Sequence, residues 1–66
     1  MTDSTEKLKV LIADDEPEML EYISCIVARA GHVVVATAAD GQELIEQHRQ
    51  HAPDLIITDV RMPEVD

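Results

Sequence analysis

Three short apolar segments alternate with two amphipathic ones, and this alternation limits the fold more than any other feature of the chain. Residues 8–13, 32–38 and 54–60 are rich in Leu, Ile, Val and Ala, which is typical of parallel strands covered on both faces. Residues 17–30 and 41–52 instead place apolar side chains at helical spacing. Strands that alternate with helices over short connections predict an α/β fold, βαβαβ, with parallel strands and right-handed crossovers.

The first predicted helix has clear end signals. Pro17 suits its first turn, where a backbone N–H is not needed, and Asp15 or Glu16 is the expected N-cap. Gly31 is expected to end it, because glycine readily adopts the left-handed conformation that follows many helices. Its apolar residues at helical spacing are Met19, Leu20, Ile23, Ile26, Val27 and Ala30.

The second predicted helix starts with a variant of the capping box. Asp40 is the expected N-cap, and Glu43 follows three residues later. Leu44 and Ile45 supply a modest apolar face, and Pro53 ends the helix.

Acidic residues follow two of the predicted strands. Asp14 and Asp15 end the first strand, and Asp59 ends the third. If the first strand lies in the middle of the sheet, the strand order is 2-1-3, one helix covers each face, and the crevice at the carboxyl ends of the strands is the expected ligand site. Because neighbouring strands lie about 4.8 Å apart, we expect these carboxylates to converge at that edge.

Converging carboxylates favour a hard divalent cation. Mg²⁺ suits such a site best, because it keeps several waters and needs few protein ligands. Zinc is disfavoured, since the three histidines show no ligand spacing with Cys25, the one cysteine. A phosphate cradle of backbone amides is also disfavoured, because the loop after the first strand reads "DDEP" and contains no glycine.

The overall charge restricts the partners. Fourteen Asp plus Glu against five Lys plus Arg give a formal net charge of −9, so direct binding to nucleic acid or to anionic lipid is not expected. No apolar run approaches the roughly 18 residues of a membrane span. Residues 1–7 read as a polar lead-in and not as a secretory signal. The single Cys25 fits a reducing cytoplasm, and we expect it to pack within the first helix.

Three segments together resemble the receiver domain of bacterial two-component response regulators: "VLIADDE" at 10–16, "LIITD" at 55–59 and "MPEVD" at 62–66. The resemblance implies a truncated, flavodoxin-like fold of strand order 2-1-3 and a phosphoryl group received from a histidine kinase or a phosphotransfer protein. It implies that Asp59 is the phosphoacceptor, that Asp14 and Asp15 hold Mg²⁺ together with Asp59, that Arg61 gives a backbone carbonyl to the metal, and that Met62 and Pro63 belong to the following loop.

The length of the chain modifies these expectations. A full receiver is about twice as long, in keeping with ordinary domain sizes, so residues 1–66 are interpreted as its N-terminal half. The family's later Ser or Thr and its Lys are then missing, which predicts impaired phosphorylation. The third strand would also be an exposed edge, which predicts a homo-oligomer formed through that strand.

Two alternatives remain beside a signalling module. A Mg²⁺-dependent phosphatase with an Asp nucleophile would need a second Asp two residues after Asp59, where Arg61 stands. A structural or assembly fragment would carry the same acidic residues without using them. Labelling by a small phosphodonor in the presence of metal would separate the signalling module from the assembly fragment.

Overall fold

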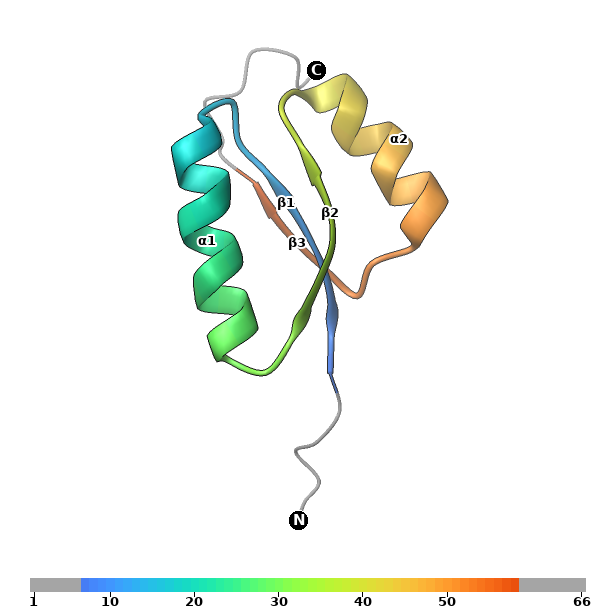
Figure 1. Ribbon diagram of the computed structural model, residues 1–66. Coiled ribbons are helices and arrows are strands. Elements are labelled where there is room, and N and C mark those ends of the chain that lie inside the picture. The colour runs from blue at the N-terminus through green and yellow to red at the C-terminus, as the bar shows by residue number, and fades with distance from the viewer. Residues whose placement is uncertain (1–6, 59–66) are drawn as a thin grey trace.

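The computed structural model describes residues 7–58, which form two helices and a three-stranded sheet (Figure 1). Each element lies within two residues of its predicted range, and the predicted strand residues 59 and 60 lie outside the described part. The elements are β1 (Lys9–Ala13), α1 (Pro17–Arg29), β2 (Val33–Ala38), α2 (Gly41–His51) and β3 (Leu55–Thr58).

The sheet is parallel, with the order β2-β1-β3, so the predicted order 2-1-3 is confirmed. Ala13, the last residue of β1, is the register partner of Ala38 in β2 and of Thr58 in β3. The β1–β2 register slips by one residue after the pair Val10 and Val34, because Leu11 is paired with Ala36. Val35 is therefore the extra residue of a bulge in β2, one of the two outer strands.

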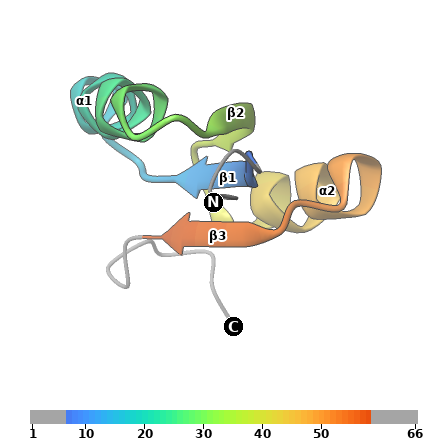
Figure 2. The same ribbon diagram turned by 90° about the horizontal axis from the view of Figure 1, so that it is seen from below.

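One helix covers each face of the sheet, as the view from below in Figure 2 shows. Alternate residues of β1 point to opposite faces. Val10 and Ile12 pack with Val27 of α1, whereas Ala13 packs with Ala38 under α2. All the residues from Val10 to Ala13 are at most 1% exposed, which confirms the prediction of a strand covered on both faces.

The end of α1 confirms the role predicted for Gly31. Gly31 has a φ of +93° and donates its N–H to the carbonyl of Ala28, while His32 donates to the carbonyl of Val27. These two hydrogen bonds form the Schellman arrangement, which satisfies carbonyls that the helix leaves without partners.

The start of α2 confirms Asp40 as N-cap and modifies the capping box. The Asp40 carboxylate accepts a hydrogen bond from the Glu43 N–H at 2.8 Å. Glu43 reaches back to the N–H of Ala39 at 2.7 Å, one residue before the usual partner, which is the N–H of the N-cap residue itself. At the other end, Ala52 adopts the left-handed conformation with a φ of 44°, immediately before Pro53.

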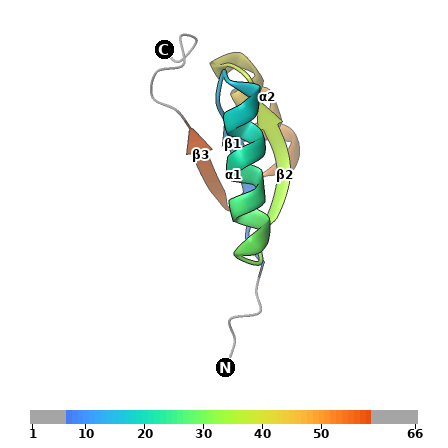
Figure 3. The ribbon, with the colours of Figure 1, turned by 60° about the vertical axis from the view of Figure 1, so that its left-hand side comes forward.

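The third strand is the least covered part of the sheet. Both helices lie against β1 and β2, and Figure 3 shows β3 to one side of α1. Leu55 and Ile56 remain 44% and 38% exposed, although Ile57 packs against the cluster of Val10 and Ile12.

The helical stripes are buried less completely than their spacing suggested. Val27 is buried, but Ile26 on the predicted stripe of α1 is 50% exposed and Ile45 of α2 is 55% exposed. Since each face of the sheet carries a single helix within residues 7–58, neither helix has a helical neighbour there to cover its flank. Neither helix is long and apolar enough to cross a membrane.

Candidate functional site

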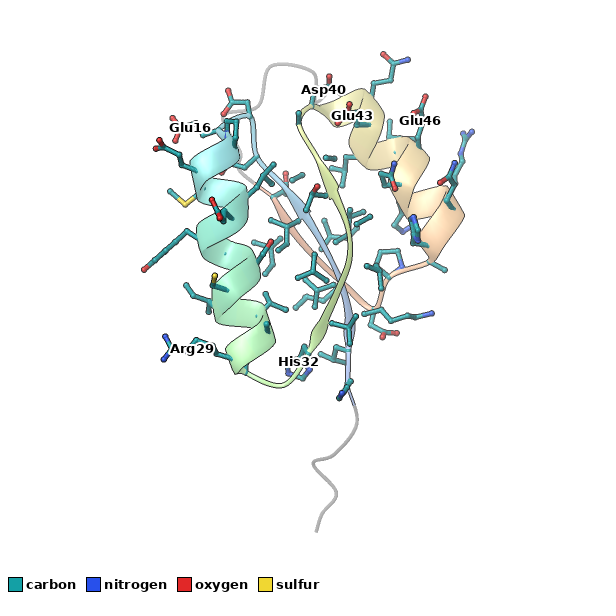
Figure 4. All side chains as sticks on the ribbon, viewed as in Figure 1. Glu16, Arg29, His32, Asp40, Glu43 and Glu46 are labelled. Atoms are coloured by element: carbon teal, nitrogen blue, oxygen red, sulfur yellow. The ribbon has the colours of Figure 1, made fainter. Side chains whose placement is uncertain are left out.

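The carboxyl end of the sheet gathers acidic residues from two connections. Asp14, Asp15 and Glu16 link β1 to α1, while Asp40 and Glu43 begin α2 after β2. Figure 4 shows Glu16, Asp40 and Glu43 at this end of the molecule and the labelled basic side chains, Arg29 and His32, at the opposite end. Both helices also begin here, and the positive ends of their dipoles favour negative charge.

Asp14 has the most constrained carboxylate of this edge. It is 5% exposed, and among residues 7–58 no other charged residue is buried. Its N–H donates to the carbonyl of Ala38 at 3.0 Å, which extends the pairing of β1 with β2 by one residue. Its Oδ1 accepts a hydrogen bond from the Glu16 N–H at 2.9 Å. A buried carboxylate needs such partners, because removing it from water is otherwise costly.

The N-cap of α1 is one of the two residues predicted for it, although its side chain plays no capping part. Glu16 occupies the N-cap position with extended backbone, but its side chain makes no capping hydrogen bond. The side chain that bonds the local backbone is that of Asp14, which accepts from the residue two positions ahead in the manner of an Asx turn. Asp15 and Glu16 are both exposed, so their carboxylates are accessible from solvent.

Two of the four predicted metal-binding residues can be placed. Asp14 and Asp15 lie at the carboxyl end of β1, whereas Asp59 and Arg61 lie outside the described residues, as do Met62 and Pro63. The last described pair of β1 and β3 is Ala13 with Thr58, after which the sequence continues with Asp14 and Asp59 respectively. From Lys7 to Thr58, no three His, Cys, Asp or Glu side chains group as metal ligands.

The donor chemistry of this edge fits Mg²⁺. A buried, oriented carboxylate stands beside an exposed one, and oxygen donors of this kind are the ligands that Mg²⁺ prefers. The Glu16 N–H donates a hydrogen bond to Oδ1 of Asp14, which restricts the rotation of the Asp14 carboxylate. The orientation of this carboxylate is therefore set without a cation.

Other residues have structural positions that the sequence patterns missed or misplaced. Cys25 is exposed, so the prediction that it packs within the helix was wrong. His32 accepts the Leu8 N–H on Nδ1 at 3.0 Å and so ties the start of β1 to that of β2. Asp54 bonds the backbone of Lys9, a contact between residues 45 positions apart that no local pattern indicates.

Comparison with known proteins agrees with the resemblance to receiver domains. The model of the response regulator receiver domain matches residues 10–66. The chain is 40% identical over 58 residues to the chemotaxis protein CheY of Bacillus subtilis, covering 88% of this chain and 48% of the relative. It is 39% identical over 64 residues to the transcriptional regulatory protein PdtaR of Mycobacterium tuberculosis, covering 97% of this chain and 31% of the relative.

The chain is 40% identical over 60 residues to a protein-glutamate methylesterase/protein-glutamine glutaminase of Oleidesulfovibrio alaskensis, covering 89% of this chain and 16% of the relative. The chain thus spans less than half of the length of each of these relatives. Since the family model covers most of the chain and the βαβαβ order agrees with the resemblance, the chain belongs to the response regulator receiver domain family.

Proposed function

We propose that this chain is a phosphoacceptor module of a two-component system, with Asp59 as the residue that is phosphorylated. The observation that carries the proposal is the position of Asp14, a buried carboxylate held at the carboxyl end of β1, where β1 pairs with the strand that leads to Asp59. Membership of the receiver family supports the same role.

The chemical step is a transfer between two side chains. A carboxylate oxygen of Asp59 forms a bond to phosphorus while the bond from phosphorus to the histidine nitrogen of the donor breaks, and the imidazole leaves with the electron pair. The donor in this proposal is a histidine kinase or a phosphotransfer protein, as the family implies.

Asp14, Asp15 and Asp59 would hold Mg²⁺ through their carboxylates, and Arg61 through its backbone carbonyl. When bound, the metal neutralises negative charge on the transferring phosphoryl group. The contribution of the chain is orientation: the Glu16 N–H and the Ala38 carbonyl together fix the side chain and the backbone of Asp14 before the cation arrives.

Labelling with phosphoramidate and Mg²⁺, followed by intact mass measurement, tests this proposal. We expect a gain of one phosphoryl group in the wild type and none in Asp59→Asn. We expect slow labelling, because the Lys that the resemblance implies in the family's later part is not among these 66 residues. Asp3→Asn is the matched control, since it removes the same chemical group from the polar lead-in. Labelling that persists in Asp59→Asn would contradict the proposal.

A second role, assembly through β3, is favoured by the exposure of that strand. Leu55 and Ile56 are exposed, and the segment from Leu55 to Thr58 contains neither the charges nor the proline that commonly protect sheet edges. We propose that two copies associate through this edge, so that each strand finds a partner for its backbone.

Sedimentation of the wild type and of Ile56→Lys at micromolar concentration tests the association. A lysine on an edge strand opposes pairing with another strand, so the variant should sediment as a monomer while the wild type forms a dimer or a larger assembly. A folded, monomeric wild type would contradict this role and leave the phosphoacceptor proposal untouched.

A further inference from the structure

The peptide group between Ala38 and Ala39 connects Glu43 to Asp14. The carbonyl of Ala38 accepts the Asp14 N–H at 3.0 Å, and the N–H of Ala39 donates to Oε1 of Glu43 at 2.7 Å. This carbonyl and this N–H belong to one peptide unit, which is planar and rigid. A displacement on the Glu43 side is therefore transmitted to the Asp14 side.

We infer that Glu43 is a positioning residue for Asp14, acting through that single peptide group. The inference rests on the metal-binding role proposed for Asp14 and goes beyond it, because Glu43 lies on α2 and is assigned no contact with metal or phosphate.

The negative charge of Glu43 strengthens its connection to Asp14. A hydrogen bond from an N–H to a carboxylate is shorter and stronger than one between neutral groups, and the distance of 2.7 Å agrees with this. Such a bond polarises the peptide group and strengthens the bond that the carbonyl accepts on its other side. Glu43 thus strengthens the hydrogen bond that holds the backbone of Asp14.

Neighbouring residues hold both ends of this connection in place. Ala38 is 1% exposed and packs with Ala13, which directly precedes Asp14. Glu43 is itself held at the first turn of α2, because its own N–H donates to Oδ1 of Asp40. The Glu43 carboxylate accepts its hydrogen bond from the N–H of Ala39 and not from that of Asp40. It therefore bonds the same peptide group whose carbonyl accepts the Asp14 N–H.

Two variants of Glu43 and one control variant separate the effect of losing the hydrogen-bond acceptor from the effect of losing a negative charge. Glu43→Ala removes the acceptor, whereas Glu43→Gln keeps an oxygen acceptor and removes only the charge. Glu46→Ala is the control, because Glu46 is an exposed acid of the same helix, as Figure 4 shows, and it removes the same charge without touching the Ala38–Ala39 peptide.

Amide hydrogen exchange is the first measurement, with the Asp14 amide expressed relative to the amide of Ile12 in the buried strand. In Glu43→Ala we expect the relative exchange of Asp14 to be about tenfold faster, the effect of weakening one hydrogen bond. A general loss of stability would accelerate both amides equally. Glu43→Gln should retain more than half of the protection, and Glu46→Ala should retain all of it.

Titration with Mg²⁺ followed by NMR is the second measurement. We expect Glu43→Ala to weaken binding about tenfold, at the low end of the losses seen when partners that orient metal ligands are removed. If wild-type Asp14 does not respond to Mg²⁺, the proposed function fails, while the exchange measurement still tests the positioning. Unchanged relative exchange in Glu43→Ala, or equal losses in the Ala and Gln variants, would overturn the inference.

Discussion

Lys9 and Asp54 exchange two hydrogen bonds at the start of the sheet. The Asp54 N–H donates to the carbonyl of Lys9 at 2.7 Å, and the Lys9 N–H donates to Oδ2 of Asp54 at 2.8 Å. The pair joins the connection after α2 to the first residue of β1, and so aligns β3 beside β1 one residue before their regular pairing begins at Val10 and Leu55. This alignment places Thr58 beside Ala13 at the carboxyl end of the sheet.

Replacing Asp54 by Ala should lower the free energy of unfolding by about 1 kcal/mol, since one hydrogen bond to a charged acceptor is lost at an exposed site. Asp54→Asn retains an oxygen acceptor and should cost less. Urea denaturation monitored by circular dichroism measures both, and equal stability of Asp54→Ala and wild type would show that the side-chain bond contributes nothing.

Gly31→Ala should destabilise the protein by about 1 kcal/mol or more, because a φ of +93° is unfavourable for any residue with a Cβ. A Cβ at this position would meet no atom within 4 Å, so the cost comes from the backbone conformation alone. Thermal unfolding should therefore show a lower Tm without a change in the content of helix. A Tm equal to that of the wild type would contradict the assigned conformation.

Ala52→Gly should have the opposite sign. Ala52 has a φ of 44°, and the following Pro53 restricts its conformation further. Glycine removes the penalty of the left-handed conformation, about 1 kcal/mol, and gives back part of it through the greater freedom of the unfolded chain. We expect a small gain in the urea midpoint, and a loss of more than 0.5 kcal/mol, roughly the size of ordinary surface effects, would contradict the expectation.

Ile12→Ala should be the most damaging of these changes. Ile12 is 0% exposed and packs with Val10 and Val27, so truncation leaves a cavity and costs about 2 to 5 kcal/mol. Such a loss is a large part of the total stability of a small domain. Ile45→Ala is the control, because Ile45 is 55% exposed and should change the free energy of unfolding by less than about 0.5 kcal/mol. Similar losses in both variants would contradict the assigned core.

The sequence by itself was sufficient for the order of the elements, and together with the family resemblance it predicted the strand order that the structure confirms. Of the predicted acidic edge, the structure places Asp14 and Asp15, while Asp59 lies outside the described residues. Local causes set the ends of the helices: Gly31 ends α1 and Asp40 starts α2. The continuous apolar run from Val10 to Ala13 is buried in the central strand of the sheet. Short connections then leave few ways to join parallel strands. The family resemblance followed from the sequence motifs at 10–16, 55–59 and 62–66.

Only the tertiary structure decided which oxygen meets which N–H. The bond from Asp54 to Lys9 joins residues 45 positions apart, and the link from Glu43 to Asp14 passes through a peptide group of β2. The exposure of Cys25 was equally beyond the reach of local pattern. Spacing along a chain determines which side chains share a helical face, but the contacts on that face depend on neighbouring elements whose placement is set by the packing of the whole sheet.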